Sequence, residues 1–342
     1  MKILHVAPIS YMIPPHSYGG TERIIYWLAK QQVEDGHVVI IMGIANPSVA
    51  SMFKMRTLFH KPPRSTIPRL AEGIHALYSL FTALQDEYDI VHNHLMTPGL
   101  QISALLNKVH VPTISTLHYD PPLATREGRI YSLFKHPCVA LSKGQAELLG
   151  KAFNIVAIIP HGIELSEYPF DDVKDDYLLY LGAIYPARGV HIAVHIAKRA
   201  RQRLLIAGPI RDPEYFAKVI KPQVDGRIIK YLGNIGGIFK KNVLKKAKAL
   251  IFPSLRYEAF GLALLEAMAC GTPIITFNRH PMSEIVENGK TGYLVKSVEE
   301  MIEATKLIDK VDPKNCRKHV ETNFSAKVME MRYLALYKKI CG

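Results

Sequence analysis

The chain has 342 residues, of which 48% are hydrophobic and 21% charged, and it carries a formal net charge of +13. This length suits two domains of ordinary size, and the composition is that of a folded soluble protein. No apolar run approaches the roughly 20 residues of a membrane-spanning helix, nothing resembles a signal peptide, and the four scattered cysteines indicate neither a zinc knuckle nor a disulfide framework, which favours a reducing cytoplasm.

Short β-branched apolar runs alternate with helical stretches along the whole chain, a pattern that predicts parallel sheets covered by helices on both faces. The runs form two series. The first series contains Ile3–Ala7, Val38–Gly43, Ile90–His92, Thr113–Leu117, Val139–Leu141 and Ile155–Ile159. The second contains Leu178–Leu181, Leu204–Ala207, Ile229–Leu232, Leu250–Phe252, Ile274–Phe277 and Tyr293–Val295. The sequence therefore predicts two Rossmann-like halves.

A polar, acidic stretch from Glu164 to Asp176 separates the two series and is interpreted as the interdomain linker. We place the N-terminal domain at residues 1–168 and the C-terminal domain at residues 169–325. Residues 326–342 are expected to form a separate terminal helix. Its apolar residues at helical spacing are Val328, Met331, Leu334, Ala335 and Tyr337.

The run from Glu258 to Gly271 carries two glutamates eight residues apart, and Glu266 lies in an almost wholly apolar, helix-forming segment. A buried carboxylate needs hydrogen-bond donors, which either a polyhydroxylated ligand or a Lys or Arg elsewhere in the chain would supply. Eight helical residues rise about 12 Å, beyond the roughly 5 to 9.5 Å that separate the carboxylates of glycosidases. Glu258 should therefore precede the helix, whose start at Gly261 would favour an anion such as phosphate.

Three further positions stand beside predicted strand ends or helix starts. Gly19-Gly20 lies between the first strand and a helix for which Thr21 is a reasonable cap, although a lone Gly-Gly is usually only a turn. His118 ends a predicted strand, where side chains face the ligand crevice of open α/β sheets, but a structural histidine has the same pattern. Arg188 follows the first strand of the second series and is well placed to bind phosphate.

Together these segments resemble the retaining glycosyltransferases of family four, with their Glu-x7-Glu motif. The resemblance extends from Met1 to about Val295. It rests on the segments at Tyr18–Arg23, Ile159–Ile163, Pro186–Val190 and Phe252–Val295. It implies a GT-B fold, in which two Rossmann-like parallel-sheet domains face each other across a cleft, and a terminal helix that packs back on the N-terminal domain.

The resemblance also implies roles for the residues that match its motifs. Glu266 would bind the donor ribose, Glu258 would face the transferred sugar, and His118 would lie near that sugar. Arg188 would stabilise the departing diphosphate. Sugar and phosphate would also contact the glycine loop and the backbone at the helix start, formed by Gly19, Gly20, Phe260, Gly261 and Leu262. The implied activity is transfer of a hexose, with retention, from a UDP-sugar or GDP-sugar to an unknown acceptor.

The chain departs from the family pattern at Ala183, where the family usually has an arginine. A charge-assisted hydrogen bond contributes about 1.5 to 3 kcal/mol, and Arg211 or Arg256 would have to replace the missing cation. No Asp-x-Asp triplet occurs in the sequence, and His92-Asn93-His94 lacks nearby Cys or carboxylate partners. We therefore expect no metal and no cofactor, with the nucleotide-sugar as substrate.

The excess of basic residues suggests partners beyond the donor. The cluster from Lys240 to Lys248 fits a helix with a solvated basic face, and attraction to a polyanion is the alternative. The basic, partly apolar segment from Met52 to Leu70 is either an acceptor-side or membrane-facing element or a loop and helix packed on the N-terminal sheet. We expect an acceptor that is anionic or membrane-bound, peripheral membrane contact, and no nucleic acid. The rival interpretation is a non-catalytic nucleotide-sugar-binding or scaffold protein. A third interpretation is a nucleotide-sugar epimerase or a phosphorylase on the same fold.

Overall fold

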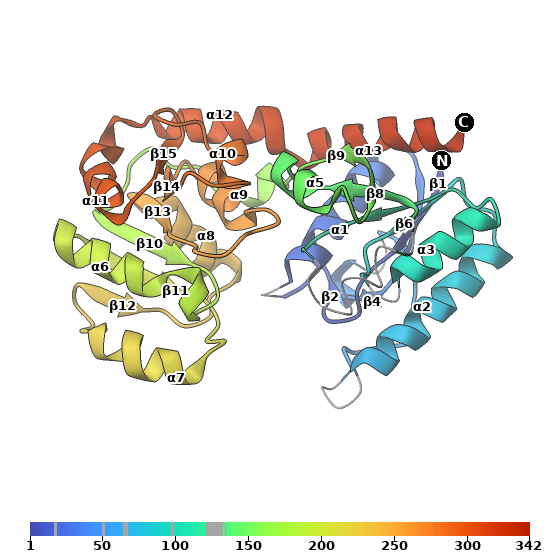
Figure 1. Cartoon of the computed structure of the whole chain (residues 1–342), viewed down its shortest axis with the longest axis horizontal. Coiled ribbons are helices and arrows are strands. Elements are labelled where there is room, and N and C mark those ends of the chain that lie inside the picture. The colour runs from blue at the N-terminus through green and yellow to red at the C-terminus, as the bar shows by residue number, and fades with distance from the viewer. Residues whose placement is uncertain (17–18, 50–51, 64–67, 97–98, 121–132, 134) are drawn as a thin grey trace. The chain divides into compact units, whose positions relative to one another are not determined.

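The structure is a computed structural model that describes residues 1–16, 19–49, 52–63, 68–96, 99–120, 133 and 135–342. It consists of two compact units (Figure 1). The first unit comprises Met1–Gly162 together with Ala326–Gly342, and the second is Ile163–Ser325. The first boundary lies six residues before the one placed after residue 168, and the second lies at the expected residue.

The first unit is built on a seven-stranded sheet in the order β5-β3-β1-β6-β7-β8-β9, in which all neighbouring strands are parallel. The strands are β1 (Lys2–Val6), β3 (Val38–Met42), β5 (Lys54–Arg56), β6 (Ile90–Asn93), β7 (Thr113–Thr116), β8 (Pro137–Ala140) and β9 (Asn154–Ile158). A separate short pair joins β2 (Met12–Ile13) to β4 (Ile44–Ala45). The six predicted strands are present, whereas β2, β4 and the edge strand β5 were not predicted.

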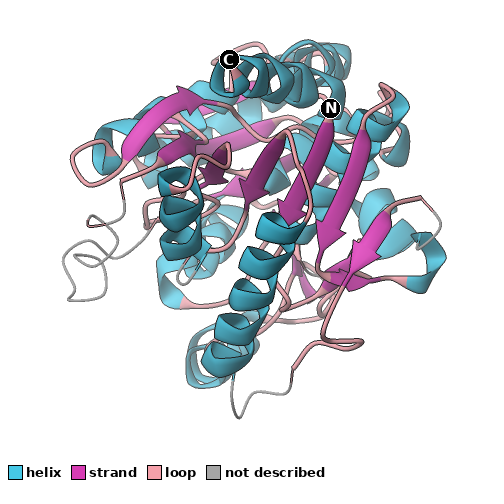
Figure 2. Cartoon of the chain, turned by 90° about the vertical axis from the view of Figure 1, so that its right-hand side faces the viewer, coloured by secondary structure: helices cyan, strands magenta, loops and turns pink. Residues whose placement is uncertain are grey.

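Alternate residues of these strands face opposite helical layers, and Figure 2 shows helices on both sides of the sheet. One layer contains α2 (Pro68–Gln85) and α3 (Gly99–Lys108), which cover a core that includes Leu4, Ile40 and Val91. The other contains α1 (Gly20–Glu34), which packs on Ile41, and α13 (Ala326–Cys341), which contacts α1. A shorter helix, α5 (Lys143–Leu149), precedes β9, and η1 (Pro47–Val49) follows β4.

The helix α13 belongs to the first unit although it is distant in sequence from the rest of that unit. Tyr333 and Tyr337 are its buried aromatic residues, at 1% and 0% exposure, and they lie against the first sheet through contacts with Thr116 and His92. The predicted apolar stripe is wrong at Met331 and Ala335, because both side chains are exposed, Met331 by 58%. Tyrosines fill the buried face instead, since their hydroxyl groups find polar partners there.

The second unit has a six-stranded parallel sheet in the order β12-β11-β10-β13-β14-β15. The strands are β10 (Tyr177–Leu181), β11 (Arg203–Ala207), β12 (Ile229–Tyr231), β13 (Ala249–Phe252), β14 (Ile274–Phe277) and β15 (Gly292–Val295). All six were predicted, with bounds that differ by at most one residue. The connecting helices are α6 (Val190–Ala200), α7 (Pro213–Tyr215), α8 (Gly237–Lys246), α9 (Leu262–Ala269), α10 (Met282–Ile285), α11 (Val298–Leu307) and α12 (Pro313–Phe324), with the short turns η2 (Leu165–Glu167), η3 (Pro186–Arg188), η4 (Phe216–Ile220), η5 (Lys221–Gln223) and η6 (Ile308–Lys310).

Both sheets reverse their strand order at one point. In the first unit this point lies between β1 and β6, and in the second between β10 and β13. Ligands of open α/β sheets bind beyond the carboxyl ends of the strands at such a switch point, because the connections leave in opposite directions and open a crevice there. A ligand site is therefore expected at the switch point of each sheet.

Candidate functional site

Arg188 and Glu258 meet beyond the carboxyl ends of β10 and β13, the two strands at the switch point of the second unit. Glu258 is 6% exposed, and its Oε1 accepts a hydrogen bond of 2.8 Å from the Ser254 hydroxyl. The Arg188 Nη1 lies 3.2 Å from the same oxygen, and the Arg256 Nε lies 3.7 Å from it. Two guanidinium groups thus surround one carboxylate, which leaves an excess of positive charge.

The hydroxyl of Tyr185 connects the two arginines. It accepts a hydrogen bond of 3.3 Å from Arg188 Nε and one of 2.8 Å from Arg256 Nη1. Arg256 was one of two cations named as a replacement for the arginine absent at Ala183, and it lies beside Glu258. Ala183 contributes its backbone carbonyl, which accepts a hydrogen bond of 3.0 Å from Tyr180.

The turn after Arg188 requires a glycine. Gly189 has φ +72°, and a Cβ at this position would lie 2.1 Å from the carbonyl oxygen of Pro253. This close approach brings the start of α6 against the end of β13. Gly189 is also the N-cap of α6, and the His191 N–H in the first turn of this helix donates to the Tyr215 hydroxyl at 3.2 Å. The start of α6 is therefore partly satisfied within the chain.

The helix α9 begins at Leu262, after Glu258, as the eight-residue spacing predicted. Gly261 is its N-cap, and no side-chain hydrogen bond caps the helix. By contrast, Ser142, Ser297 and Asp312 cap α5, α11 and α12 through their side chains. An uncapped start next to two guanidinium groups suits an anionic ligand, since it leaves N–H donors and the positive end of the helix dipole available.

Glu266 is 4% exposed and makes its two hydrogen bonds through the same oxygen. Its Oε1 accepts from the Tyr168 hydroxyl at 2.8 Å and from Lys240 Nζ at 2.7 Å. The alternative of a buried salt bridge to a lysine is therefore realised within the chain. Among the residues that the structure describes, Oε2 has no hydrogen-bond partner, so one oxygen of Glu266 remains able to accept from a ligand.

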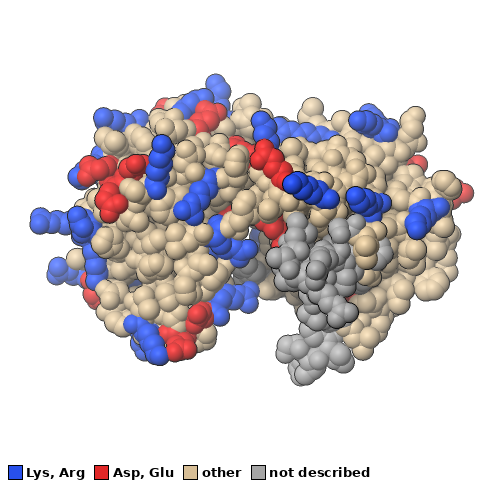
Figure 3. Space-filling model, viewed as in Figure 1, with Lys and Arg blue, Asp and Glu red and all other residues tan. Residues whose placement is uncertain are grey.

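The acidic partners of the lysines on and after α8 were not predicted from the sequence. Instead of forming a solvated basic face, Lys240 pairs with Glu266, and three further lysines pair with acidic residues. Lys241 lies 3.5 Å from Glu167, Lys246 lies 2.7 Å from Asp171, and Lys248 lies 3.4 Å from Asp176 and 3.2 Å from Asp309. The acidic residues of the predicted linker were the available signal. Figure 3 shows acidic side chains between the Lys and Arg side chains on the visible face of this unit.

In the first unit, Gly19 and Gly20 form the start of α1. Gly19 is the N-cap with φ +139°, and a Cβ there would lie 2.8 Å from Pro15. Thr21 was expected to cap the helix, but it lies inside α1, because the chain already turns at Gly19. The carboxyl of Glu22 is 3% exposed, and burial raises its pKa to about 7.

His118 follows β7 and forms hydrogen bonds through both ring nitrogens. Its Nε2 lies 2.9 Å from His94 Nδ1, and its Nδ1 lies 3.3 Å from His161 Nε2. Burial lowers the pKa of His118 to about 3, so the ring is neutral at pH 7. A neutral ring offers one donor and one acceptor, and cannot act as a cation toward phosphate.

Three buried histidines of the first unit stand close enough to hold a metal ion. They are His5 on β1 and His92 and His94 on and after β6, with ligand atoms within 4.8 Å of one another. His92 and His94 were noted in the sequence, but His5 was missed, because the pairing of β1 with β6 brings it there. The ring nitrogens already have hydrogen-bond partners, such as His94 for His5 and Tyr337 for His92. The absence of a metal remains a prediction.

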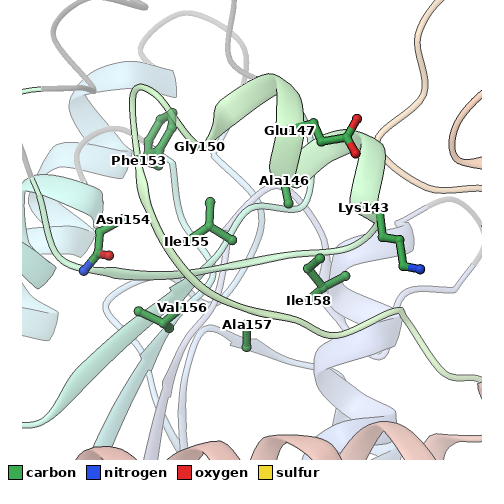
Figure 4. A pocket seen from close by; sticks show the side chains of 10 residues that line it. All are labelled: Lys143, Ala146, Glu147, Gly150, Phe153, Asn154, Ile155, Val156, Ala157 and Ile158. Carbon is green, nitrogen blue, oxygen red and sulfur yellow. The ribbon is translucent and has the colours of Figure 1, made fainter.

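The first unit has a pocket of about 800 Å³ between α5 and the edge strand β9 (Figure 4). None of the predicted site residues lines this pocket. Lys143 and Glu147 line it from α5, and Ile158 from β9. Its walls combine aliphatic side chains with two opposite charges. This pocket therefore lacks the cations and the glycine turn found beyond β10 and β13.

Comparison with known proteins identifies the family. The profile of the "Glycosyltransferase Family 4" matches residues 18–167, and that of the "Glycosyl transferases group 1" matches residues 166–321. The two matches overlap at residues 166 and 167, and together they cover every strand of both sheets except β1. The chain belongs to the family-four glycosyltransferases. It is thus a sugar-transferring enzyme by family, and its two Rossmann-like units form a GT-B fold.

Individual relatives resemble this glycosyltransferase over nearly its whole length. The O-antigen chain mannosyltransferase C of Escherichia coli is 24% identical, and the alignment covers 98% of each chain. Sucrose-phosphate synthase from Thermosynechococcus elongatus has a similar structure, with TM-score 0.80, 18% identity and 99% of each chain covered. The structure of Anabaena HepE in complex with UDP and glucose has TM-score 0.75 and 17% identity, and covers 99% of this chain and 100% of that one. Among the described residues, no helix has the length and apolar character needed to cross a membrane.

Proposed function

We propose that this glycosyltransferase transfers a hexose, with retention of the anomeric configuration and without a metal, from a UDP-sugar or GDP-sugar. The observation that carries this proposal is the convergence of Arg188 and Arg256 on Glu258, next to the uncapped start of α9. A diphosphate there would be neutralised by guanidinium groups and backbone N–H donors. A metal clamp is then unnecessary.

The chemical step that we propose is the one that the resemblance to the family implies. The bond between the anomeric carbon and the diphosphate oxygen breaks, and the acceptor oxygen forms its bond on the same face of the sugar. The acceptor hydroxyl transfers its proton to the departing phosphate, so no protein base is needed. Arg188 and Arg256 stabilise the charge that develops on the leaving group, and Glu258 stays near the sugar. Glu266 accepts from the ribose through Oε2.

We also propose that the acceptor is membrane-bound, on the evidence of α2. Five large apolar side chains on its outer face are between 44% and 59% exposed: Leu70, Ile74, Leu77, Phe81 and Leu84. The inner face of the same helix buries polar His75, Ser79 and Thr82 beside the small residues Ala71, Ala76 and Ala83. The helix thus exposes the large apolar side chains that a surface helix usually buries. Leu105 and Val109 extend the apolar surface on or just after α3, with exposed Lys108 between them to attract anionic lipid.

Calorimetric titration in EDTA with UDP-glucose, GDP-mannose and UDP-N-acetylglucosamine tests the donor site. We expect one donor class to bind wild type, and at least tenfold weaker binding to Glu266→Ala. Glu321→Ala, which replaces an exposed glutamate on α12, is the matched control and should bind as wild type does. Unchanged affinity in Glu266→Ala would refute the assignment of the site.

The same titration separates the alternative functions. Binding followed by release of nucleotide when acceptor lipid extracts are added supports the transferase. Binding of a donor without turnover with any extract would support a non-catalytic nucleotide-sugar-binding protein, the interpretation that Ala183 favours. A product in which only the donor has changed would indicate an epimerase.

A further inference from the structure

A continuous chain of buried side chains leads from α1 to His118. The Gln32 side chain, which is fully buried, places its Oε1 2.7 Å from His5 Nε2. His5 Nδ1 lies 2.9 Å from His94 Nε2, and His94 Nδ1 lies 2.9 Å from His118 Nε2. His118 Nδ1 then meets His161 Nε2 at 3.3 Å. Four imidazoles are therefore joined in series. His5, His94 and His118 take part through both ring nitrogens, and His161, at the end of the series, through Nε2.

Each contact in this series needs one proton. Burial lowers the pKa of His5 to about 4 and that of His118 to about 3, and it lowers the pKa values of His94 and His161 well below their usual range. The rings are therefore neutral at pH 7, with one N–H and one bare nitrogen each. If one nitrogen of a neutral ring donates a hydrogen bond, the other nitrogen can only accept one. The series consequently has only two states, with all protons on Nε2 or all on Nδ1.

Gln32 decides between these two states, since a carbonyl oxygen can only accept. With Oε1 toward His5, the proton of His5 lies on Nε2, and the same follows for His94, His118 and His161. The other end of the amide agrees with this assignment. Gln32 Nε2 donates to the Tyr337 hydroxyl at 3.4 Å, which leaves that hydroxyl free to donate to His92 Nδ1 at 2.6 Å. His92 then donates from Nε2 to Thr116 Oγ1 at 2.7 Å.

We propose that Gln32 is a positioning residue that fixes the tautomer of His118 through His5 and His94, so that His118 presents Nδ1 as a hydrogen-bond acceptor. The contact of Nδ1 with His161 is the longest in the series, so a hydroxyl group of a ligand replaces it most readily. That ligand must donate its proton to His118. The opposite state would present an N–H at this place and select an acceptor group instead. The proposed contact between His118 and a ligand hydroxyl rests on the proposed transferase function and on the place near the sugar that the family resemblance implies for His118. The assignment of the tautomer does not.

The direct test is ¹⁵N NMR of the histidine rings in the intact protein at pH 7. All five rings in the wild type, including that of His92, should carry their proton on Nε2. Gln32→Met removes the acceptor at similar size and should give a mixture of tautomers at His118, while Gln32→Glu keeps the acceptor and should restore one tautomer. Gln31→Met, the same change on the adjacent residue of α1, is the control and should leave the spectrum unchanged.

Protons on Nδ1 of His5, His94 or His118 in the wild type would overturn the proposal, even if no variant folds. It would equally be overturned if stoichiometric Zn²⁺ removed the ring N–H signals of His5 and His94, because the rings would then form a metal site. With the donor identified by calorimetry, kcat/KM of Gln32→Met should fall about 3- to 10-fold and recover in Gln32→Glu. A normal tautomer pattern with no effect of Gln32→Met on kcat/KM would refute only the proposed contact between His118 and a ligand hydroxyl.

Discussion

The replacement of Arg188 by methionine should reduce catalysis more than it reduces stability. Methionine keeps much of the side-chain length, but removes the guanidinium that lies 3.2 Å from Glu258 and 3.3 Å from the Tyr185 hydroxyl. Glu258 keeps its hydrogen bond from Ser254 and its neighbour Arg256. The anion site would retain one of its two guanidinium groups.

The size of the effect follows from these contacts. A hydrogen bond to a charged group contributes about 1.5 to 3 kcal/mol, which corresponds to roughly 10- to 150-fold in kcat/KM if the bond acts in the transition state. Arg256 is 46% exposed in its side chain and lies farther from Glu258, so we expect it to compensate only in part. Stability should fall by about 1 kcal/mol, at the low end for a buried group that loses one partner, because Ser254 still binds Glu258.

The assay is nucleotide release with the donor found by calorimetry, together with urea unfolding of each variant. Arg188→Lys keeps a charge but not the planar guanidinium, and should fall between wild type and Arg188→Met. Arg227→Met, which changes an exposed arginine of the same unit, should leave kcat/KM unchanged. Equal kcat/KM in Arg188→Met and wild type would refute the assignment of the leaving-group site to Arg188.

Three further predictions concern stability, the donor site and the membrane. Burial lowers the pKa of His5 from 6.5 to about 4, so between these values the unfolded chain binds a proton that the folded chain does not. The free energy of unfolding should therefore decrease as the pH is lowered, by about 2 kcal/mol between pH 7 and pH 5 for this residue. Equal values from urea unfolding at pH 7 and at pH 5 would contradict this. Lys240→Met should lower the free energy of unfolding by about 1 to 3 kcal/mol, because Glu266 keeps only Tyr168, whereas the exposed Lys318→Met should not. Leu77→Ser with Phe81→Ser should reduce flotation with vesicles of anionic lipid at least tenfold without changing donor affinity, and undiminished flotation would exclude α2 as the membrane contact.

Most strands of the two sheets could be predicted from the sequence, because buried parallel strands are continuous apolar runs that need no partner to be recognised. The short strands β2, β4 and β5 lack such a run and were missed. The position of Glu258 before α9 could also be predicted, since the spacing of the two glutamates is a local property. The partners of those glutamates could not. Lys240 reaches Glu266 from another helix, and its neighbours in sequence indicated only a charged surface.

The histidine series shows the same limit in the first unit. His118 could be found from its place at a strand end, but His5 and His94 become its neighbours only through the pairing of β1 with β6. Gln32 gives no signal in the sequence at all, because it is one polar residue on an amphipathic helix. Its importance depends on which atoms it faces.

The return of α13 to the first unit determines the order in which the two units can be completed during synthesis. Residues Ile163–Ser325 form one continuous segment and can fold as soon as they have left the ribosome. The first unit must wait, because Tyr333 and Tyr337, which cover His92 and Thr116, are made after the whole of the second unit. Until then the polar face of its sheet lacks part of its cover, so the segment translated first is the last to become fully native.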